Sequence, residues 1–242
     1  RLMTLVTLIV VLIISLFLLI EVEAYGIMRL DFSGWLPPYG ILFVGDAFAL
    51  LLVTVATVVT IACSIYAFST IGEAHENMFF YSFVLMLVAG VNGSFLTGDI
   101  FNLFVCFEVM LLASYVLVAL GGGKRQLRES LKYVLINVVA SWMFLVALAY
   151  LYGAIGTLNM AHIATRVAEV GQDPVLTTIS LVFLIVFSLK AGLLLFFWLP
   201  GSYSVPPTSV AALFAALLTK VGMYAIIRTF TLMFPHNQEV TH

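Results

Sequence analysis

Seven apolar runs, each long enough to cross a lipid bilayer, constrain the fold of this 242-residue chain more than any other feature. A transmembrane helix needs about 20 apolar residues to cross a hydrocarbon layer about 30 Å thick. Lipid cannot satisfy backbone polar groups, so such runs are expected to be helices, and the sequence lacks the short alternating segments of a barrel. The predicted spans are residues 2–20, 40–69, 79–97, 99–120, 131–152, 175–198 and 208–233.

The composition excludes several classes of protein. Only 9% of the residues are charged and 63% are hydrophobic, which leaves too little polar surface to face water, so the bilayer is the expected surrounding. The net charge of -2, without a large basic patch, argues against a nucleic-acid partner. Cys63 and Cys106 lie in apolar runs without metal-ligand spacing, and we expect neither a metal nor another cofactor.

The charged segments between the spans predict the orientation. Residues 121–132 form a basic loop, and short basic loops favour the cytoplasmic side of the membrane. Counting spans outward from that loop places residues 21–39 and 153–174 outside a bacterial cell, as parts of a multi-pass plasma membrane protein. The run 40–69 is too long for an upright helix, so we expect it to tilt or extend past the bilayer. The basic residues of the loop are Lys124, Arg125, Arg128 and Lys132.

Turn residues interrupt the helical pattern in three places. Residues 24–35 alternate partly and end in turn residues, which is compatible with a short external hairpin. Residues 97–99 must form a tight turn between two spans. The segment LPGSYSVPP at 199–207 must stop the preceding helix, because proline lacks a donor and clashes with the previous turn; Thr208 or Ser209 is then expected to cap the next helix.

Three charged residues lie deep inside apolar runs, where charge is expensive. Glu108 lies about 15 Å into its span at 1.5 Å per residue, and Lys190 and Lys220 lie at similar depth in theirs. Each such residue costs about 2.5–3.5 kcal/mol at a helix centre. Two interpretations follow: a structural ion pair between Glu108 and Lys190, or proton transfer through groups whose proton affinity changes when the pair separates.

Polar residues on the same helices favour a hydrated path. Tyr115 follows Glu108 by seven residues, which places both on one helix face. Two stripes at spacing i, i+4, i+8 can hydrogen-bond between helices or contact water. They consist of Tyr133, Asn137 and Ser141, and of Lys220, Tyr224 and Arg228.

The histidines argue against haem chemistry and against hydrolysis. All of them lie in loops or at span ends, so no pair is placed to clamp a haem within the membrane. The apolar runs also hold no Ser/His/Asp or Cys/His set, so we expect no catalytic residues. The histidines are His75, His162, His236 and His242.

Several long motifs occur in order and resemble a known family. GDIFNLFVCFEVMLLASYVL at 98–117 and QLRESLKYVLIN at 126–137 are similar to the antiporter-like subunits shared by Mrp-type sodium/proton antiporters, respiratory complex I and related membrane hydrogenases. FSLKAGLL, FWLP and ALLTKVGMYAIIR add to the resemblance, which covers roughly residues 40–234.

The resemblance implies a fold and a division of the chain. The family has fourteen spans with two inverted five-helix repeats, each containing a broken helix, and this chain is expected to be a fragment with spans two to eight. Residues 1–78 would hold the N-terminal spans, residues 79–234 a proton-translocating repeat, and residues 235–242 a terminal loop. The stretch KAGLLLFFWLP departs from the family, because it lacks a proline usually found before WLP and is one residue short.

The resemblance also implies a function. The family's buried glutamate and lysines match Glu108, Lys190 and Lys220, which would carry protons in a subunit of a multisubunit Na⁺/H⁺ antiporter. Such a transporter subunit is not itself an enzyme, and its partners are the other subunits, H⁺ and Na⁺. The alternatives are a subunit of a redox-driven proton pump, or a structural membrane subunit with a static ion pair.

Overall fold

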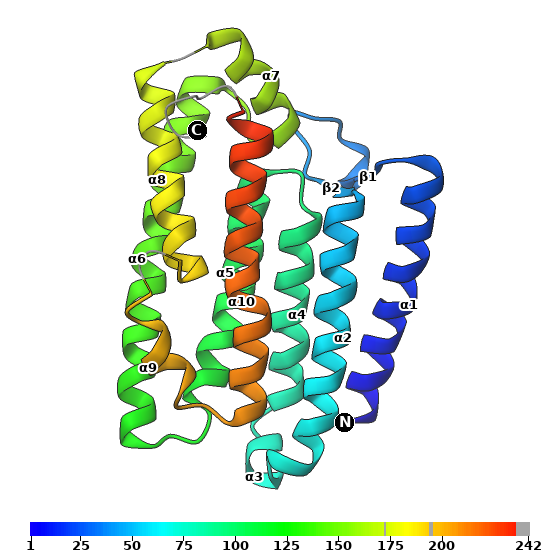
Figure 1. The fold of residues 1–242 in the computed structure, drawn as a ribbon, viewed down its shortest axis with the longest axis vertical. Helices are drawn as coiled ribbons and strands as arrows, with labels where there is room; N and C mark the ends of the chain where they lie inside the picture. The colour runs from blue at the N-terminus through cyan, green and yellow to red at the C-terminus, as the bar shows by residue number, and fades with distance from the viewer. Residues whose placement is uncertain (172, 194–195, 236–242) are drawn as a thin grey trace.

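The computed structural model describes residues 1–171, 173–193 and 196–235, which form an elongated helical bundle (Figure 1). Six of the described helices are long and apolar enough to cross a membrane, and α4, of 17 residues, is a shorter apolar helix. The predicted all-α membrane class is confirmed. Except for Pro235, the predicted terminal loop lies outside the described residues. The apolar helices of the bundle, including the shorter α4, are α1 Leu2–Tyr25, α2 Ala47–Thr70, α4 Phe80–Leu96, α5 Ile100–Ala119, α6 Lys124–Ile155, α8 Pro174–Ala191 and α10 Thr208–Arg228, which continues as the π-helical turn η2 Thr229–Met233.

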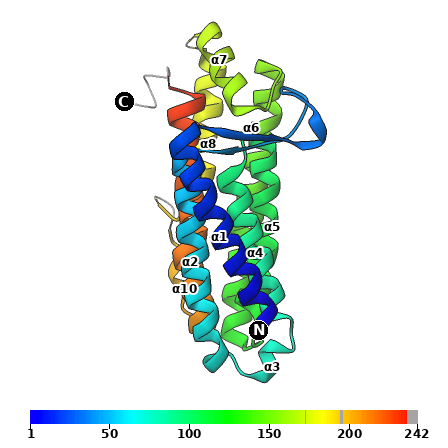
Figure 2. The same cartoon turned by 90° about the vertical axis from the view of Figure 1, so that its right-hand side faces the viewer.

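A small antiparallel sheet lies across one end of the bundle, beside α7 (Figure 2). Met28 of β1 lies opposite Gly45 of β2, and Asp31 lies opposite Leu42. The predicted hairpin at 24–35 is therefore only half right, because its second strand comes from the run 40–69 assigned to a span. The short elements are β1 Met28–Asp31, η1 Phe32–Gly34, β2 Leu42–Gly45, α3 Glu73–Glu76, α7 Met160–Val170 and α9 Leu199–Tyr203.

Asp46 explains where the second span begins. Its carboxylate accepts a hydrogen bond from the Ala49 amide at 2.9 Å, which caps the first turn of α2. The residues before it pair with β1, so the excess length of the run 40–69 is used in a strand. The expected tilt or extension of a longer helix is not needed.

The expected loop 121–132 is wrong beyond Gly123. Helix α6 begins at Lys124, because the basic segment consists largely of good helix formers and continues the apolar helix that follows. The expected external loop 153–174 likewise contains α7, whose buried face carries Met160, Ile163 and Val167.

Two helix starts test the predicted turns. The tight turn at 97–99 is confirmed: α4 ends before Thr97, and Asp99 caps α5 by accepting from the Asn102 amide at 2.8 Å. Before α10 the capping position is occupied by Pro207, without a side-chain cap. The expectation that Thr208 or Ser209 caps this helix is wrong, because the helix begins one residue earlier than a Ser or Thr cap requires.

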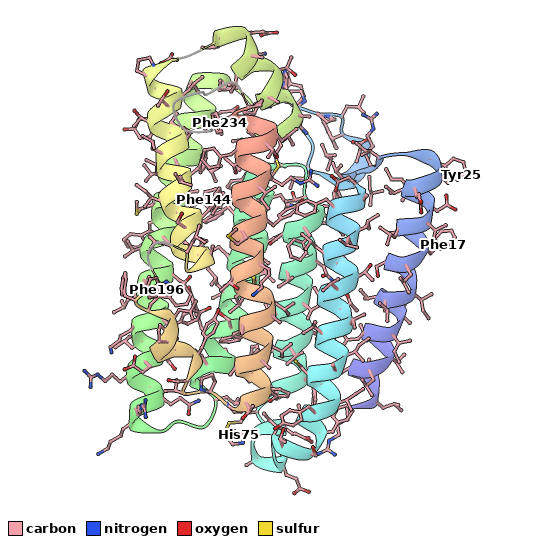
Figure 3. The ribbon with its side chains drawn as sticks, viewed as in Figure 1. Phe17, Tyr25, His75, Phe144, Phe196 and Phe234 are labelled. Carbon is pink, nitrogen blue, oxygen red and sulfur yellow. The ribbon has the colours of Figure 1, made fainter. Side chains whose placement is uncertain are left out.

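Close helix contacts and aromatic side chains build the core. An added Cβ at Gly90 of α4 would lie 2.6 Å from the Met110 amide nitrogen, so glycine lets α4 and α5 touch through their backbones. Phe144 and Phe234 are fully buried inside the bundle, whereas Phe17 and Tyr25 project outward from α1 (Figure 3). An outer surface of this apolar character is what a bilayer requires.

Candidate functional site

Lys190 lies at a break in the sixth predicted span, residues 175–198. Helix α8 ends at Ala191, seven residues before the predicted end at 198, and the chain becomes helical again at Leu199 in α9. Gly192 takes the left-handed conformation (φ 62°), and the Leu193 amide donates to the Ser188 carbonyl at 3.0 Å, as in a Schellman cap. Trp198 Nε1 donates to the Leu189 carbonyl at 3.2 Å, which fixes the returning chain against the helix end.

Glu108 and Lys190 are linked through Ser141. Lys190 Nζ donates to Ser141 Oγ at 3.0 Å, and Ser141 Oγ donates to Glu108 Oε1 at 2.5 Å. The three side chains come from α8, α6 and α5, and both hydrogen bonds point from the amine toward the acid. The expected approach of acid and amine is present, but a serine hydroxyl takes the place of a direct contact or a water.

Apolar groups surround the charged end of this hydrogen-bonded chain. The Lys190 side chain is 5% exposed, and its Nζ lies 5.0 Å from the centroid of the Phe107 ring, a cation–π geometry. Phe107 stacks on Phe187 at 6.2 Å, and the Phe144 ring meets Phe187 edge-on at 5.0 Å. Water is largely excluded here, so electrostatic interactions at Lys190 are stronger than they would be at a surface.

The remaining polar residues predicted to line the path differ in their contacts. The Tyr133 and Ser114 hydroxyls share a hydrogen bond of 2.8 Å, and Asn137 Nδ2 donates to the Tyr133 carbonyl of its own helix. The Tyr115 ring meets the Tyr133 ring edge-on at 5.5 Å, and its buried hydroxyl has no partner within the described part of the chain. A buried polar group without a protein partner commonly binds an ordered water.

Lys220 does not join this group. Its side chain is exposed on the surface of α10, where Nζ donates to the Ala215 carbonyl at 2.7 Å and to Thr219 Oγ1 at 3.2 Å. The prediction that it is buried like Lys190 is wrong for this chain. Depth along an apolar run gives no information about which side of the helix a residue occupies.

Tyr224 belongs to a second polar cluster, toward the sheet end of the bundle. Its hydroxyl donates to the Phe95 carbonyl at 2.6 Å and accepts from Arg228 Nε at 2.8 Å. Arg228 Nη2 contacts both carboxylate oxygens of Asp46 at 2.5 Å. The sequence placed Tyr224 and Arg228 on one stripe but offered no signal for Asp46, which is 182 residues away.

The described residues offer no group of three or more His, Cys, Asp or Glu side chains placed to hold a metal ion. The arrangement at Glu108, Ser141 and Lys190 instead consists of an acid, a hydroxyl and an amine in hydrogen-bond order. Such a series of hydrogen-bonded side chains can itself move a proton, because each of the three groups can both release and accept a proton.

Residues 97–242 match the family model described as NADH:quinone oxidoreductase/Mrp antiporter, TM. The chain is 54% identical over 232 residues to the D-type subunit of the Na(+)/H(+) antiporter of Alkalihalophilus pseudofirmus and 49% identical over 231 residues to that of Bacillus subtilis. These alignments cover 96% and 95% of this chain but 47% of each relative, so the chain spans about half the length of the curated relatives.

Two solved complexes contain similar chains. One belongs to the Mrp complex from Dietzia sp. DQ12-45-1b, with a TM-score of 0.88 and 31% identity over 96% of this chain and 44% of that one. The other belongs to an archaeal respiratory membrane complex, the membrane-bound sulfane sulfur reductase, with a TM-score of 0.89 and 28% identity over 97% of this chain and 48% of that one. With more than half of its residues matched by the family model, the chain belongs to the NADH:quinone oxidoreductase/Mrp antiporter family of transmembrane proteins.

Proposed function

We propose that this chain is part of a D-type subunit that moves protons within an Mrp-type Na⁺/H⁺ antiporter in the plasma membrane. The observation that carries the proposal is the hydrogen-bonded chain Lys190–Ser141–Glu108 inside the bundle. The names of the curated relatives support both the transported ions and the presence of partner subunits.

The direction of the hydrogen bonds suggests how a proton moves. Lys190 donates to Ser141 while Ser141 donates to Glu108, so a concerted shift transfers a proton from the ammonium to the carboxylate. This shift leaves both end groups neutral, which low-dielectric surroundings favour over separated charges. Because Lys190 lies at the end of a broken helix, a small movement of α8 is sufficient to open the chain of hydrogen bonds.

The proposed translocating unit is the segment 79–234, with α4, α5, α6, α8 and α10 as its five helices. Residues 1–78 then hold the N-terminal spans and the sheet. Lys220 lies on the surface of this unit, and we propose that it passes protons onward to parts of the full-length protein beyond this segment.

Glu108→Gln in the full-length subunit tests the proposal. The amide keeps the shape of the side chain but cannot accept the proton, so sodium-dependent dissipation of a pH gradient in everted vesicles should fall at least about a hundredfold. Glu73→Gln, on the exposed α3, is the matched control and should leave exchange unchanged. Normal exchange by an assembled Glu108→Gln complex would show that this acid is not part of the proton path.

A redox-driven proton pump is the second candidate, favoured by the likeness to the archaeal respiratory complex. Such a subunit would use the same acid and lysine, with the energy supplied by electron transfer in partner proteins. Exchange that requires only sodium and a pH gradient in vesicles supports the antiporter. Pumping that appears only when an electron donor is supplied supports the redox-driven complex.

A further inference from the structure

A cavity of about 330 Å³ lies at the end of the bundle that carries the sheet and α7, opposite the basic segment. The hairpin, the start of α2, the turn before α5, the start of α7 and the end of α10 all contribute to its lining. Most of the lining is apolar, including Leu42 and Met160, and the charged lining residues are Arg29, Asp46 and Arg228. Its volume lies at the lower end of the range for small-ligand sites.

Asn159 supplies a buried hydrogen-bond donor to this cavity. Its Oδ1 accepts from the His162 amide at 3.0 Å and caps α7, so this oxygen is already used. The residue is 3% exposed, it lines the cavity, and its Nδ2 has no partner within the described residues. A buried donor without an acceptor is costly, so the cavity is suited to an occupant that presents an acceptor oxygen.

The charges of the lining point to the same kind of occupant. Arg228 is held by Asp46 and Tyr224, which leaves Arg29 as the second guanidinium of the lining. Its side chain is 65% exposed and forms a long ion pair of 3.9 Å with Asp31, which lies outside the lining; this distance is too long for a hydrogen bond, so the Arg29 donors are free to bind an acceptor oxygen. The lining therefore contains two guanidinium groups and one carboxylate, together with an unused amide donor.

We propose that this cavity binds the phosphate group of a membrane phospholipid, with phosphate oxygens accepting from Asn159 Nδ2 and pairing with Arg29. The apolar walls and the position at the ends of α2 and α10 match the interface where headgroups and acyl chains meet. Guanidinium groups and amide donors are standard partners of phosphate oxygens. The site is separate from the proton path, because Glu108, Ser141 and Lys190 are not among its lining residues.

Asn159→Asp is the decisive variant. It keeps an oxygen that can cap α7 but replaces the donor nitrogen with a second, negatively charged oxygen. The matched control is Thr165→Asp, which adds the same charge on an exposed position of α7 outside the cavity lining. Both are made in the full-length subunit within its purified, delipidated complex.

The measurement is the number and affinity of phosphatidylglycerol molecules bound, by native mass spectrometry, with diacylglycerol as the phosphate-free probe. Wild type and Thr165→Asp should bind one phosphatidylglycerol more than Asn159→Asp, or bind it at least about tenfold more tightly. Equal binding by all three proteins would overturn the proposal. Displacement of that lipid by millimolar inorganic phosphate would assign the site to free phosphate, and sodium-dependent stabilisation that is stronger in Asn159→Asp would assign it to a cation.

Discussion

The importance of a single residue could be predicted when the sequence itself shows that placing it there costs free energy. Glu108 and Lys190 could be singled out because a charge within an apolar run requires a reason. The role of Ser141 could not, because a helix serine usually bonds to its own backbone and carries no cost that a sequence reveals. Lys220 shows the converse: its place within an apolar run is right, but the side of the helix it occupies depends on packing.

Ser141→Ala removes the bridge between the two charges. We expect proton-coupled exchange in vesicles to fall at least about tenfold, because a hydrogen bond to a charged group contributes about 1.5–3 kcal/mol. Ser141→Thr keeps the hydroxyl and should retain most of the exchange. If Ser141→Ala and Ser141→Thr behave alike, steric fit rather than the hydroxyl determines the effect.

Lys190→Arg separates a proton carrier from a structural cation. Arginine keeps the positive charge and can still donate to Ser141, but it does not release its proton at any accessible pH. Exchange should therefore be abolished in a complex that still assembles, as judged by co-purification of its subunits. A static ion pair would instead tolerate arginine, so near-normal exchange by assembled Lys190→Arg would favour the structural interpretation.

At the scale of elements, hydropathy located all seven apolar helices but not where each begins and ends. The boundaries moved where local chemistry competes with hydropathy: Asp46 caps α2 and leaves Leu42–Gly45 to a strand, and Gly192 ends α8 inside an apolar run. The prolines at 200, 206 and 207 correctly predicted an interruption, yet α8 stops before them. The break is set by Gly192 in its left-handed conformation. A glycine within an apolar run does not change the hydropathy pattern, so that pattern does not reveal where the helix ends.

Gly222 on α10 keeps this break in place. An added Cβ there would lie 2.5 Å from the Ala191 amide nitrogen, so Gly222→Ala must push the end of α8 away and displace Lys190. We expect a lower thermal stability of the assembled complex and a loss of exchange. Gly153→Ala is the control: its added Cβ meets nothing within 4 Å, and alanine in a helix should stabilise by about 0.5–1 kcal/mol. Equal stability of the two variants would contradict this role for the close contact.

At the scale of the whole molecule, the two ends of the bundle differ in chemistry. One end carries the basic start of α6, and the other carries the sheet, α7 and the ion pair between Asp46 and Arg228 (Figure 1). The basic end could be predicted, because its lysines and arginines are clustered in one short stretch of the sequence. The pairing of Asp46 with Arg228 could not be predicted, since it depends on how helices distant in the chain meet.

The orientation determines which compartment reaches Lys190. Helix α8 runs from the sheet end toward the middle of the bundle and ends at Ala191, so Lys190 lies in its last turn, at the end of the helix nearer the basic end of the molecule. The last carbonyls of a helix need partners from outside it, and water can supply them, so we expect the compartment at the basic end to supply protons to Lys190. From the positive-inside rule we expect that compartment to be the cytoplasm.

Cysteine labelling in a background without Cys63 and Cys106 tests this orientation. Leu127→Cys lies at the exposed basic end and Thr165→Cys on the exposed face of α7, so an impermeant maleimide can reach each from one side only. In intact cells Thr165→Cys should react and Leu127→Cys should not, and everted vesicles should reverse the pattern. Reaction of Leu127→Cys in intact cells would place the basic end outside and make the external medium the source of protons for Lys190. Labelling of both positions after permeabilisation is the control, because it shows that each thiol is reactive once the reagent has access.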